Sequence, residues 1–544
     1  MWAASVAVVA ALTALIAWSC WQRWQLLAAS PFPLGVDGYF YPLELRSLLA
    51  HGELQYPASP LTFYLLAPFA AMTDPITGAK LGAAVLGAAI AGPAYGVGAR
   101  LGGGRGAGLV AAVLATTSVG SAYLTIEFVK NGIGLTVALA ALWLVLRAVE
   151  RPTRLAMAGA GAALVAAYAT HKMAGALVLV VAIPVVLTAA AAHGALRTRR
   201  AIVVGAGLAA IAIAVLAVGA AFPHRVLSVA DAQLVRGLWS RTPHWTAPAL
   251  VSRTGELAIG HDALLGLGLG LVALVARLAP GRAAQLAARA RARSAAAWRR
   301  VARRRRSGLP ATREAPPLDG PDPAAAAPGI AAPPPVVVAA GWPIVVLAIA
   351  IGVPFLAVTD RQGLGFRLRI AAFVPAALTA AIVARDLLGR YRHRDYGLAG
   401  LALVLAVARS PGSQLDGEII THPALVTAAQ ALNGQIPRDA ILIVPERHIA
   451  FLVAWYTGAT VAIRPDGIPP AHRFRLLPLH FIGAGTALDH QLMAARAEPS
   501  VPPPLGVHPR HPNGLVLVAE PTWAWILARL PDDDRAYFTA WPTI

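Results

Sequence analysis

The sequence predicts a mainly α-helical, polytopic membrane protein with about 11 transmembrane helices and a small C-terminal α/β domain outside the membrane. Of the 544 residues, 57% are hydrophobic and 13% are charged, and the mean hydropathy is +0.62. A soluble protein of this length would carry roughly twice that charged fraction. Apolar runs of roughly 20 residues, the length of a transmembrane helix, recur up to residue 409. These observations exclude a soluble globular protein.

The apolar runs define the candidate transmembrane helices. The predicted spans are 2–20, 77–99, 107–123, 131–149, 155–170, 173–192, 201–221, 257–278, 338–358, 369–385 and 396–409. The apolar segment 61–72 is not counted, because its 12 residues cover about 18 Å of the roughly 30 Å hydrocarbon core. We expect this segment to lie along the membrane interface.

The arginine distribution predicts which side of the membrane each connection faces. Connections after the even-numbered spans carry most of the arginine, including the Arg- and Pro-rich loop 279–337, and Arg23 is the one exception. Cytoplasmic loops are enriched in Lys and Arg, so this side is predicted to be cytoplasmic. Cytoplasmic anchoring also explains the net charge of +20 better than nucleic-acid binding does. The Ala, Gly, Pro and Arg bias is typical of a GC-rich bacterial genome, so we expect the cytoplasmic membrane of a bacterium.

The other side receives two large segments. These are an outer segment, 21–76, within the transmembrane domain 1–409, and the tail 410–544. The tail alternates short strand-like and helix-like runs, which predicts an extracytoplasmic α/β domain. The strand-like runs are 441–444, 460–463 and 515–518, and the helix-like runs are 448–458 and 522–530.

Asp37 is the first candidate functional residue. It lies in the outer segment just before a helix-like stretch, 39–50. An aspartate in this position commonly caps the helix N-terminus. Alternatively, a carboxylate at the membrane surface can act as a general base that takes a proton from an acceptor hydroxyl. Both interpretations are open from the sequence.

Three further side chains of the outer segment are candidates for an acceptor groove: Tyr39, Glu44 and Tyr56. Glu44 follows Asp37 by seven residues and shares its helical face if the helix begins early. A solvated helix face is the favoured alternative for Glu44, and an interfacial aromatic anchor is the favoured one for Tyr39.

The short outer connections elsewhere are also charged. Glu127 and Lys130 lie three residues apart and either form a local ion pair or separate into a metal ligand and a phosphate contact. Arginines in these connections could bind a phosphate, because guanidinium groups suit phosphate oxygens well. The simpler alternatives to phosphate binding are an ion pair between Asp360 and Arg361 and, for Lys172, a side chain that extends to the membrane surface. The predicted phosphate-binding residues are Lys130, His171, Lys172, Arg361, Arg367 and Arg369.

One stretch of the outer segment has a family pattern. The residues HGELQYPASPLTFYLL, from His51 to Leu66, follow G-x-L-x-Y-P-x-x-P-L-x-x-Y-L-L. Together with a first span and an outer loop containing an aspartate, this pattern resembles the polytopic GT-C glycosyltransferases of the protein-mannosyltransferase and aminoarabinose-transferase-like branch. The resemblance covers the spans up to about residue 200 and, beyond them, only the architecture. The family often has consecutive prolines here, whereas this chain separates Pro57 and Pro60 by Ala-Ser.

The resemblance implies a glycosyltransferase that uses a polyprenyl-phosphate-linked sugar donor and transfers the sugar with inversion on the outer face. The acceptor would be a glycan, a lipid or a protein. Asp37 matches the family's first-loop acid, which acts as the base. Glu127 falls in the second outer loop, where many members have an acid that assists a divalent cation such as Mg or Mn. This chain has one glutamate there, without the paired acids of some branches.

Two rival functions remain open. A non-catalytic binding or assembly protein with a degenerate site is compatible with the single acid of the second outer loop. A transporter of lipid-linked sugars would need a polar path through the membrane, and the predicted spans contain few charged residues. The transporter is therefore disfavoured.

Overall fold

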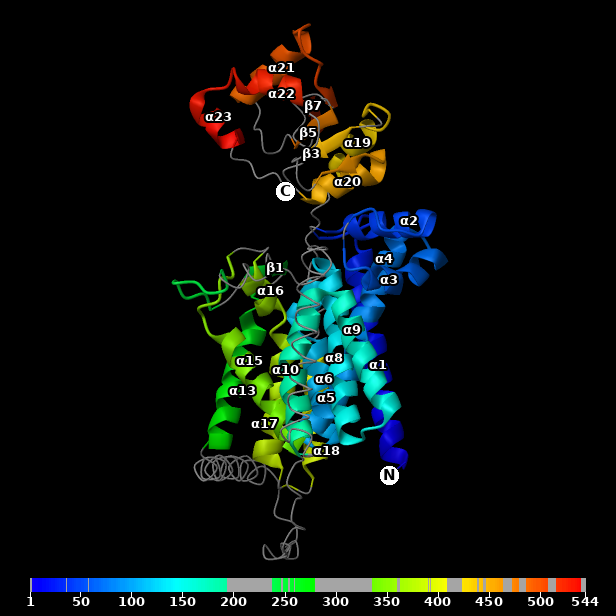
Figure 1. Cartoon of the computed structure of the whole chain (residues 1–544), viewed down its shortest axis with the longest axis vertical. Coiled ribbons are helices and arrows are strands. Elements are labelled where there is room, and N and C mark those ends of the chain that lie inside the picture. The colour runs from blue at the N-terminus through cyan, green and yellow to red at the C-terminus, as the bar shows by residue number, and fades with distance from the viewer. Residues whose placement is uncertain are drawn as a thin grey trace, which may run out of the picture. The chain divides into compact units, whose positions relative to one another are not determined.

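A computed structural model shows the chain as two compact units (Figure 1). The first unit comprises Met1–Arg23, Val85–Leu124 and Lys130–Leu415, and the second comprises Trp24–Ala84, Thr125–Val129 and Asp416–Ile544. The structure describes residues 2–35, 37–56, 58–192, 237–245, 248–252, 255–258, 260–278, 335–359, 363–389, 391, 393–408, 423–437, 440–443, 447–462, 472–478, 486–506 and 515–539. The predicted outer segment and the predicted tail thus fold largely as one unit.

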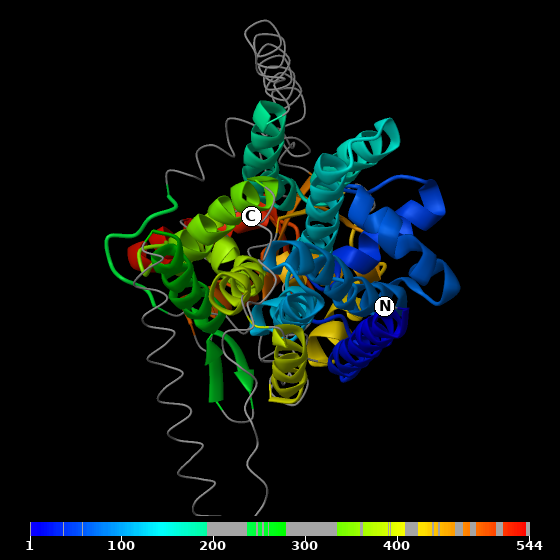
Figure 2. The same ribbon diagram turned by 90° about the horizontal axis from the view of Figure 1, so that it is seen from below.

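The first unit is a bundle of helices that run side by side (Figure 1). Its helices are α1 (Trp2–Ala28), α5 (Ala91–Gly102), α6 (Arg105–Thr116), α7 (Val119–Ile126), α8 (Val129–Glu150), α9 (Arg154–Thr170), α10 (Lys172–Ala192), α13 (Gly260–Leu278), α15 (Pro335–Gly352), α16 (Leu364–Ile370), α17 (Phe373–Leu388) and α18 (Arg394–Ala408). Seen from below, these helices appear nearly end-on (Figure 2). Helix α17 packs against α5, α6, α13 and α15, while α10 packs against α9 and α15. A two-stranded hairpin, β1 (Pro248–Ser252) and β2 (Gly255–Ala258), precedes α13.

The mainly helical architecture is confirmed, and the described residues contain five to seven helices that could cross a membrane by length and composition. The five single helices are Ser5–Ala28, Pro75–Gly102, Val129–Glu150, Lys172–Ala191 and Gly260–Leu278, and two helix pairs bent by 45° are α6 with α7 and α16 with α17. Helix α9 has 17 residues and α18 has 15, which makes both short for a span. The predicted span 201–221 lies outside the described residues. Eleven spans are therefore not confirmed.

Arg23, the exception to the arginine distribution, is buried in the first unit. Its guanidinium donates to the carbonyl oxygen of Thr116 at 3.0 Å, to the hydroxyl of Ser121 at 2.7 Å and to the hydroxyl of Ser19. Thr116 ends α6 and Ser121 lies in α7, so the arginine bridges the bend between these two helices. A helix break exposes carbonyl groups that need donors. Arg23 therefore has a structural role at this bend.

The second unit begins with short helices: α2 (Phe40–His51), α3 (Leu61–Met72) and the first part of α4 (Pro75–Ala88). The 12 residues of α3 confirm that the apolar segment 61–72 forms a helix too short to cross a membrane. Helix α4 folds back onto α3 at Gly78, where a Cβ atom would lie 2.3 Å from the Cα of Ala70. Glycine is required at this position because no side chain fits between the two backbones.

The tail forms a five-stranded sheet with helices, which agrees with the predicted α/β pattern. The strand order is β4 (Thr460–Val461), β3 (Ile441–Ile443), β5 (Arg473–Pro478), β7 (Leu515–Ala519) and β6 (Leu505–Gly506). Strand β3 is parallel to β4 and β5, whereas β7 is antiparallel to β5 and β6. The helices are α19 (Pro423–Ala431), α20 (Arg447–Thr457), α21 (Ala487–Ala497), α22 (Glu520–Leu527) and α23 (Asp532–Thr539).

The predicted tail elements correspond to β3, α20, β4, β7 and α22. The sequence pattern did not reveal β5, β6, α19, α21 and α23. Strand β5 reads RFRLLP, in which only the first four residues alternate charged and apolar side chains, so the strand pattern is short and ends at a proline. Arg475 of this strand instead pairs with Glu520 at 3.2 Å and lies over the ring of Trp523. Tertiary contacts therefore decide the conformation of β5.

Candidate functional site

Asp37 lies in a turn between α1 and α2. The amide of Gly38 donates to the carbonyl of Gly35 at 3.0 Å, and the amide of Phe40 donates to the carbonyl of Asp37 at 3.0 Å. Helix α2 begins at Phe40 with Tyr39 as its N-cap residue and has no side-chain cap. The N-cap interpretation of Asp37 is therefore wrong. The aspartate side chain is instead buried, with 7% of the residue exposed.

The turn that carries Asp37 packs against the segment that carries Glu127. A Cβ atom on Gly35 would lie 2.5 Å from the carbonyl oxygen of Ile126 and 3.1 Å from Oε2 of Glu127. Gly35 also has a φ angle of +82°, so glycine is needed here for two reasons. Glu127 is buried and lies between α7 and α8 rather than within a helix. The structure thus brings two buried acidic segments of the second unit together.

Lys80 is a residue near these segments to which sequence reasoning attached no function. Its ammonium group donates to the carbonyl of Ser30 at 2.6 Å, which ties α4 to the segment leading to Asp37. Lys80 also lines a small cavity of about 20 Å³ together with Gly38 and Ile126. A lysine within a predicted span is a signal of a functional or structural polar site. That signal could have identified Lys80 from the sequence.

A cationic cluster lies at one end of the first unit. Lys130 is in the first turn of α8, Lys172 begins α10, and Arg367 lies in α16. His171 connects α9 to α10 and is buried. The pKa of His171 is lowered from 6.5 to about 3, mainly by desolvation and then by the charges of Lys130, Arg367 and Lys172, in that order. Four of the six predicted phosphate-binding residues are therefore electrostatically coupled in the structure.

This cluster is suited to an anion. The ring atom Nδ1 of His171 is enclosed and has no hydrogen-bond partner among the described residues. A buried polar atom without a partner costs roughly 1–3 kcal/mol. The charges of Lys130, Arg367 and Lys172 all act on His171, and a phosphate bound beside the imidazole would attract each of them. The arrangement can therefore hold a phosphate group by charge and by hydrogen bonding.

The depressed pKa of His171 predicts a pH-dependent stability. Between pH 6.5 and about 3 the unfolded chain binds a proton at this residue, whereas the folded chain does not. Stability therefore falls as the pH falls through this window, by about 1.4 kcal/mol per pH unit. We expect the Tm of the purified protein to decrease between pH 6.5 and 4.5 and His171→Gln to reduce this dependence. His51→Gln, which changes an exposed histidine, is the control, and an unchanged slope in His171→Gln would contradict the assignment.

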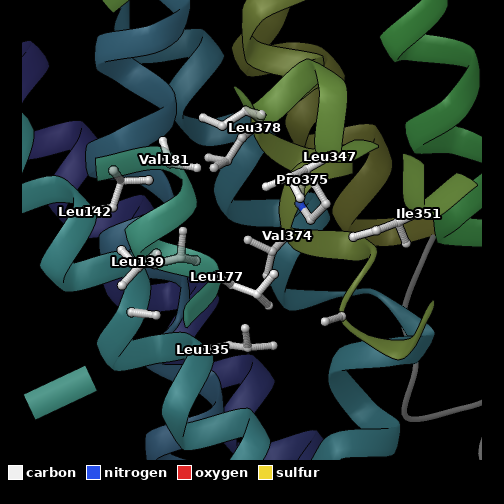
Figure 3. Close-up of a pocket in the computed structure, with 14 residues that line it drawn as sticks. Leu135, Leu139, Leu142, Leu177, Val181, Leu347, Ile351, Val374, Pro375 and Leu378 are labelled. Carbon is white, nitrogen blue, oxygen red and sulfur yellow. The ribbon is translucent and has the colours of Figure 1, made fainter. Parts of the chain in front are cut away.

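An apolar cavity of about 60 Å³ lies on the same helices (Figure 3). Leu135 follows Lys130 by five residues on α8, and Leu177 follows Lys172 by five residues on α10, about 7.5 Å along each helix. The lining is formed by aliphatic side chains and Pro375 from α8, α10, α15 and α17, with Ala371 between α16 and α17. The labelled lining residues are Leu135, Leu139, Leu142, Leu177, Val181, Leu347, Ile351, Val374, Pro375 and Leu378. The charged end and the apolar cavity thus follow each other along α8 and α10.

Arg369 and Arg361 do not join the described cluster. Arg369 is fully buried and donates to the carbonyl oxygens of Trp245 at 3.2 Å and Val353 at 2.9 Å. These contacts use the guanidinium to connect α16 with the end of α15, so its position is structural. Arg361 lies outside the described residues.

The sequence favoured a solvated helix face for Glu44, but the structure buries this residue fully. Its two carboxylate oxygens accept hydrogen bonds from the backbone amides of Gln55 and Tyr56, both at 2.9 Å. Asp37 precedes α2, so the two acids do not share a helical face. The sequence could not predict this role because the two amides follow Glu44 by 11 and 12 residues. Glu44 therefore clamps the chain segment after α2.

Tyr39 and Tyr56 are also buried, and both contact the tail within the second unit. The hydroxyl of Tyr39 lies 3.4 Å from that of Tyr456, and the hydroxyl of Tyr56 accepts from the amide of Val461 at 3.2 Å. The interfacial exposure favoured for Tyr39 is thus wrong. Arg46, which sequence reasoning missed, donates to the carbonyl of Trp455 and lies 4.3 Å from its ring centroid. These side chains join the outer segment to α20 and β4 rather than line an open groove.

A metal site is not apparent from side-chain grouping alone. Among the residues that the structure describes, no group of three or more His, Cys, Asp and Glu side chains could hold a metal ion. Asp37 and Glu127 would supply two carboxylates, and Mg²⁺ commonly combines one or two carboxylates with waters and substrate phosphates. The predicted divalent cation therefore remains a prediction.

Comparison with known proteins does not identify a family for this chain. No family model and no curated protein matches the chain. The candidate functional residues are the cationic cluster beside the apolar cavity in the first unit and, separately, the two acidic segments in the second unit.

Proposed function

We propose that the protein is a membrane glycosyltransferase that moves a sugar from a polyprenyl-phosphate-linked donor to an acceptor on the outer face of a bacterial cytoplasmic membrane. The observation that carries this proposal is the cationic cluster of Lys130, Lys172 and Arg367 around His171, with an apolar cavity further along α8 and α10. A polyprenyl phosphate has the same two parts, an anionic group and a hydrocarbon chain. The proposal includes the predicted topology, in which about 11 helices cross the membrane and the tail lies on its outer side.

The reaction follows from the chemistry of the leaving group. Asp37 takes the proton of the acceptor hydroxyl, whose oxygen forms a bond to the anomeric carbon. The bond from that carbon to the phosphate oxygen breaks, and its electron pair leaves with the polyprenyl phosphate. Lys130, Lys172 and Arg367 stabilise the negative charge that develops on the phosphate. Attack opposite the leaving group inverts the anomeric centre.

The other predicted groups have supporting roles in this proposal. Glu127 adjoins the turn that carries Asp37, and these two carboxylates would hold Mg²⁺ or Mn²⁺, which would supply positive charge for the leaving phosphate. Tyr39, Glu44 and Tyr56 position the outer segment on the tail, and the tail orients the glycan, lipid or protein acceptor.

A transfer assay tests the proposal. The full-length protein, reconstituted in liposomes, is supplied with radiolabelled hexoses and pentoses on polyprenyl phosphate and with membrane extracts as acceptors. We expect label to enter an acceptor fraction from at least one lipid-linked donor and from none of the nucleotide-linked sugars. Transfer only from nucleotide-linked sugars, or none from any donor by folded protein, would exclude the proposal.

A non-catalytic binding or assembly protein is the second candidate. The observation that favours it is the small space beside the Asp37 turn, where the cavity of about 20 Å³ has room for about one water molecule. In that case the cationic cluster still binds polyprenyl phosphate, but no sugar is transferred. Binding of labelled polyprenyl phosphate without transfer would support this candidate. A transporter stays disfavoured, because the predicted spans contain few charged residues.

A further inference from the structure

A second cavity, of about 480 Å³, lies at the opposite ends of helices from the cationic cluster. It is formed where α5 and α8 end and α9 begins, on the side that the arginine distribution predicts to be cytoplasmic. Three arginines line it, Arg100, Arg147 and Arg151, together with one carboxylate, Glu150. The ionised side chains of the lining therefore leave an excess of two positive charges.

Two of the three arginines of this cavity, Arg100 and Arg147, lie beside one aromatic ring. Nε of Arg100 lies 3.3 Å from a carboxylate oxygen of Glu150, and its NH1 donates to the carbonyl of Gly96 at 3.1 Å. The ring of Trp143 lies 5.8 Å from the guanidinium of Arg100 and 5.4 Å from that of Arg147. Cation–π contacts of this kind keep both guanidinium groups beside one aromatic platform. Two like charges are thereby held near each other at the cavity wall.

The rest of the lining is apolar or neutral. Leu144 and Leu155 contribute aliphatic surface, and Thr153 caps the N-terminus of α9 by accepting from the amide of Ala156. The N-terminus of a helix carries a partial positive charge, which adds to that of the arginines. The face of α9 that continues from the cavity exposes Leu155 at 84% and Val165 at 69%. A cationic cavity wall is thus followed along α9 by exposed apolar side chains.

We propose that this cavity binds the phosphate headgroup of an anionic phospholipid, with the acyl chains along the exposed face of α9. Charge complementarity selects the headgroup, because two uncompensated guanidinium groups attract a phosphate and arginine binds its oxygens through paired donors. The exposed leucine and valine of α9 select a lipid over a free phosphate, since a free phosphate gains nothing from that surface. Basic pockets between helix ends at the cytoplasmic side bind lipid headgroups in this way. The site is separate from sugar transfer and does not depend on it.

Native mass spectrometry of the full-length protein in detergent measures this binding. The probes are phosphatidylglycerol and phosphatidylcholine of equal chain length, each titrated against wild type, Arg100→Gln/Arg147→Gln, Arg151→Gln and Arg154→Gln. Arg154 neighbours the cavity but does not line it, so it is the matched control. We expect the double substitution to weaken phosphatidylglycerol binding about 30-fold and Arg151→Gln about fivefold, from the contribution of each arginine near an anionic lipid. Arg154→Gln should bind like wild type.

Three results would overturn the proposal. These are equal binding of phosphatidylglycerol by all four proteins, equal binding of the two lipids by wild type, and displacement of the lipid by an equal concentration of inorganic phosphate. The last result would assign the cavity to a free anion. Because the Arg151 side chain is exposed, its substitution keeps the test valid if the double variant does not fold.

Discussion

Asp37→Asn should lower sugar transfer by about 10²–10⁴-fold, the usual contribution of a general base. The substitution keeps the size of the side chain and removes the charge that accepts the proton. Asp37 lies in a buried turn against the Glu127 segment, so Asn should retain most of the packing around it. The measurement is the initial rate of transfer from the polyprenyl-phosphate-linked donor in liposomes that contain equal amounts of folded protein.

Glu53→Gln is the matched control for this prediction, because Glu53 is an exposed carboxylate in the same outer segment. It should transfer sugar at the wild-type rate. Asp37→Glu, which keeps the carboxylate one methylene further out, should retain more activity than Asp37→Asn. Equal rates for wild type and Asp37→Asn would remove Asp37 from the mechanism while leaving the transferase proposal intact.

Glu44→Ala should destabilise the second unit by about 2–6 kcal/mol, because two buried amides would each lose an acceptor at a cost of roughly 1–3 kcal/mol. The amides belong to Gln55 and Tyr56, and Tyr56 in turn contacts Val461 of the tail. Loss of the clamp should therefore loosen the outer segment from the tail. The measurement is the Tm of the purified protein together with the rate of proteolysis of the second unit.

Two variants separate this clamp from a simple charge effect. Glu44→Gln keeps one acceptor oxygen and should be destabilised less than Glu44→Ala. Glu53→Ala removes the same charge from an exposed position and should leave the Tm unchanged. If Glu44→Ala were as stable as Glu53→Ala, the carboxylate would not be the clamp that its contacts indicate.

Local patterns predicted much of the secondary structure. The apolar runs at 131–149 and 173–192 correspond to α8 and α10, and the run at 515–518 corresponds to β7. Such runs can be recognised from the sequence, because consecutive apolar residues must be buried whichever elements pack against them. The span count was harder to read, because α6 with α7 and α16 with α17 are bent by 45° and α9 is short.

The candidate site was predicted in part. Lys130 and Lys172 were predicted because they lie in charged outer connections, and the structure couples them electrostatically to His171, as it does Arg367. Arg369 was predicted with them because guanidinium groups suit phosphate oxygens, although its guanidinium binds two backbone carbonyls. A charged residue in a short connection can be exposed, paired or buried, and its sequence neighbours do not distinguish these states.

The sequence by itself determined that the chain is mainly helical and highly apolar, and that its tail alternates strands and helices. It also determined which rare charged side chains were available for a site. Only the tertiary structure decided that Glu44 is a buried clamp, that Tyr39 and Tyr56 contact the tail, and that the Asp37 turn meets the Glu127 segment. The physical reason is the separation along the sequence over which each interaction acts. Apolar periodicity acts over a few residues, whereas the burial of a charged group depends on donors that the fold brings from distant parts of the chain.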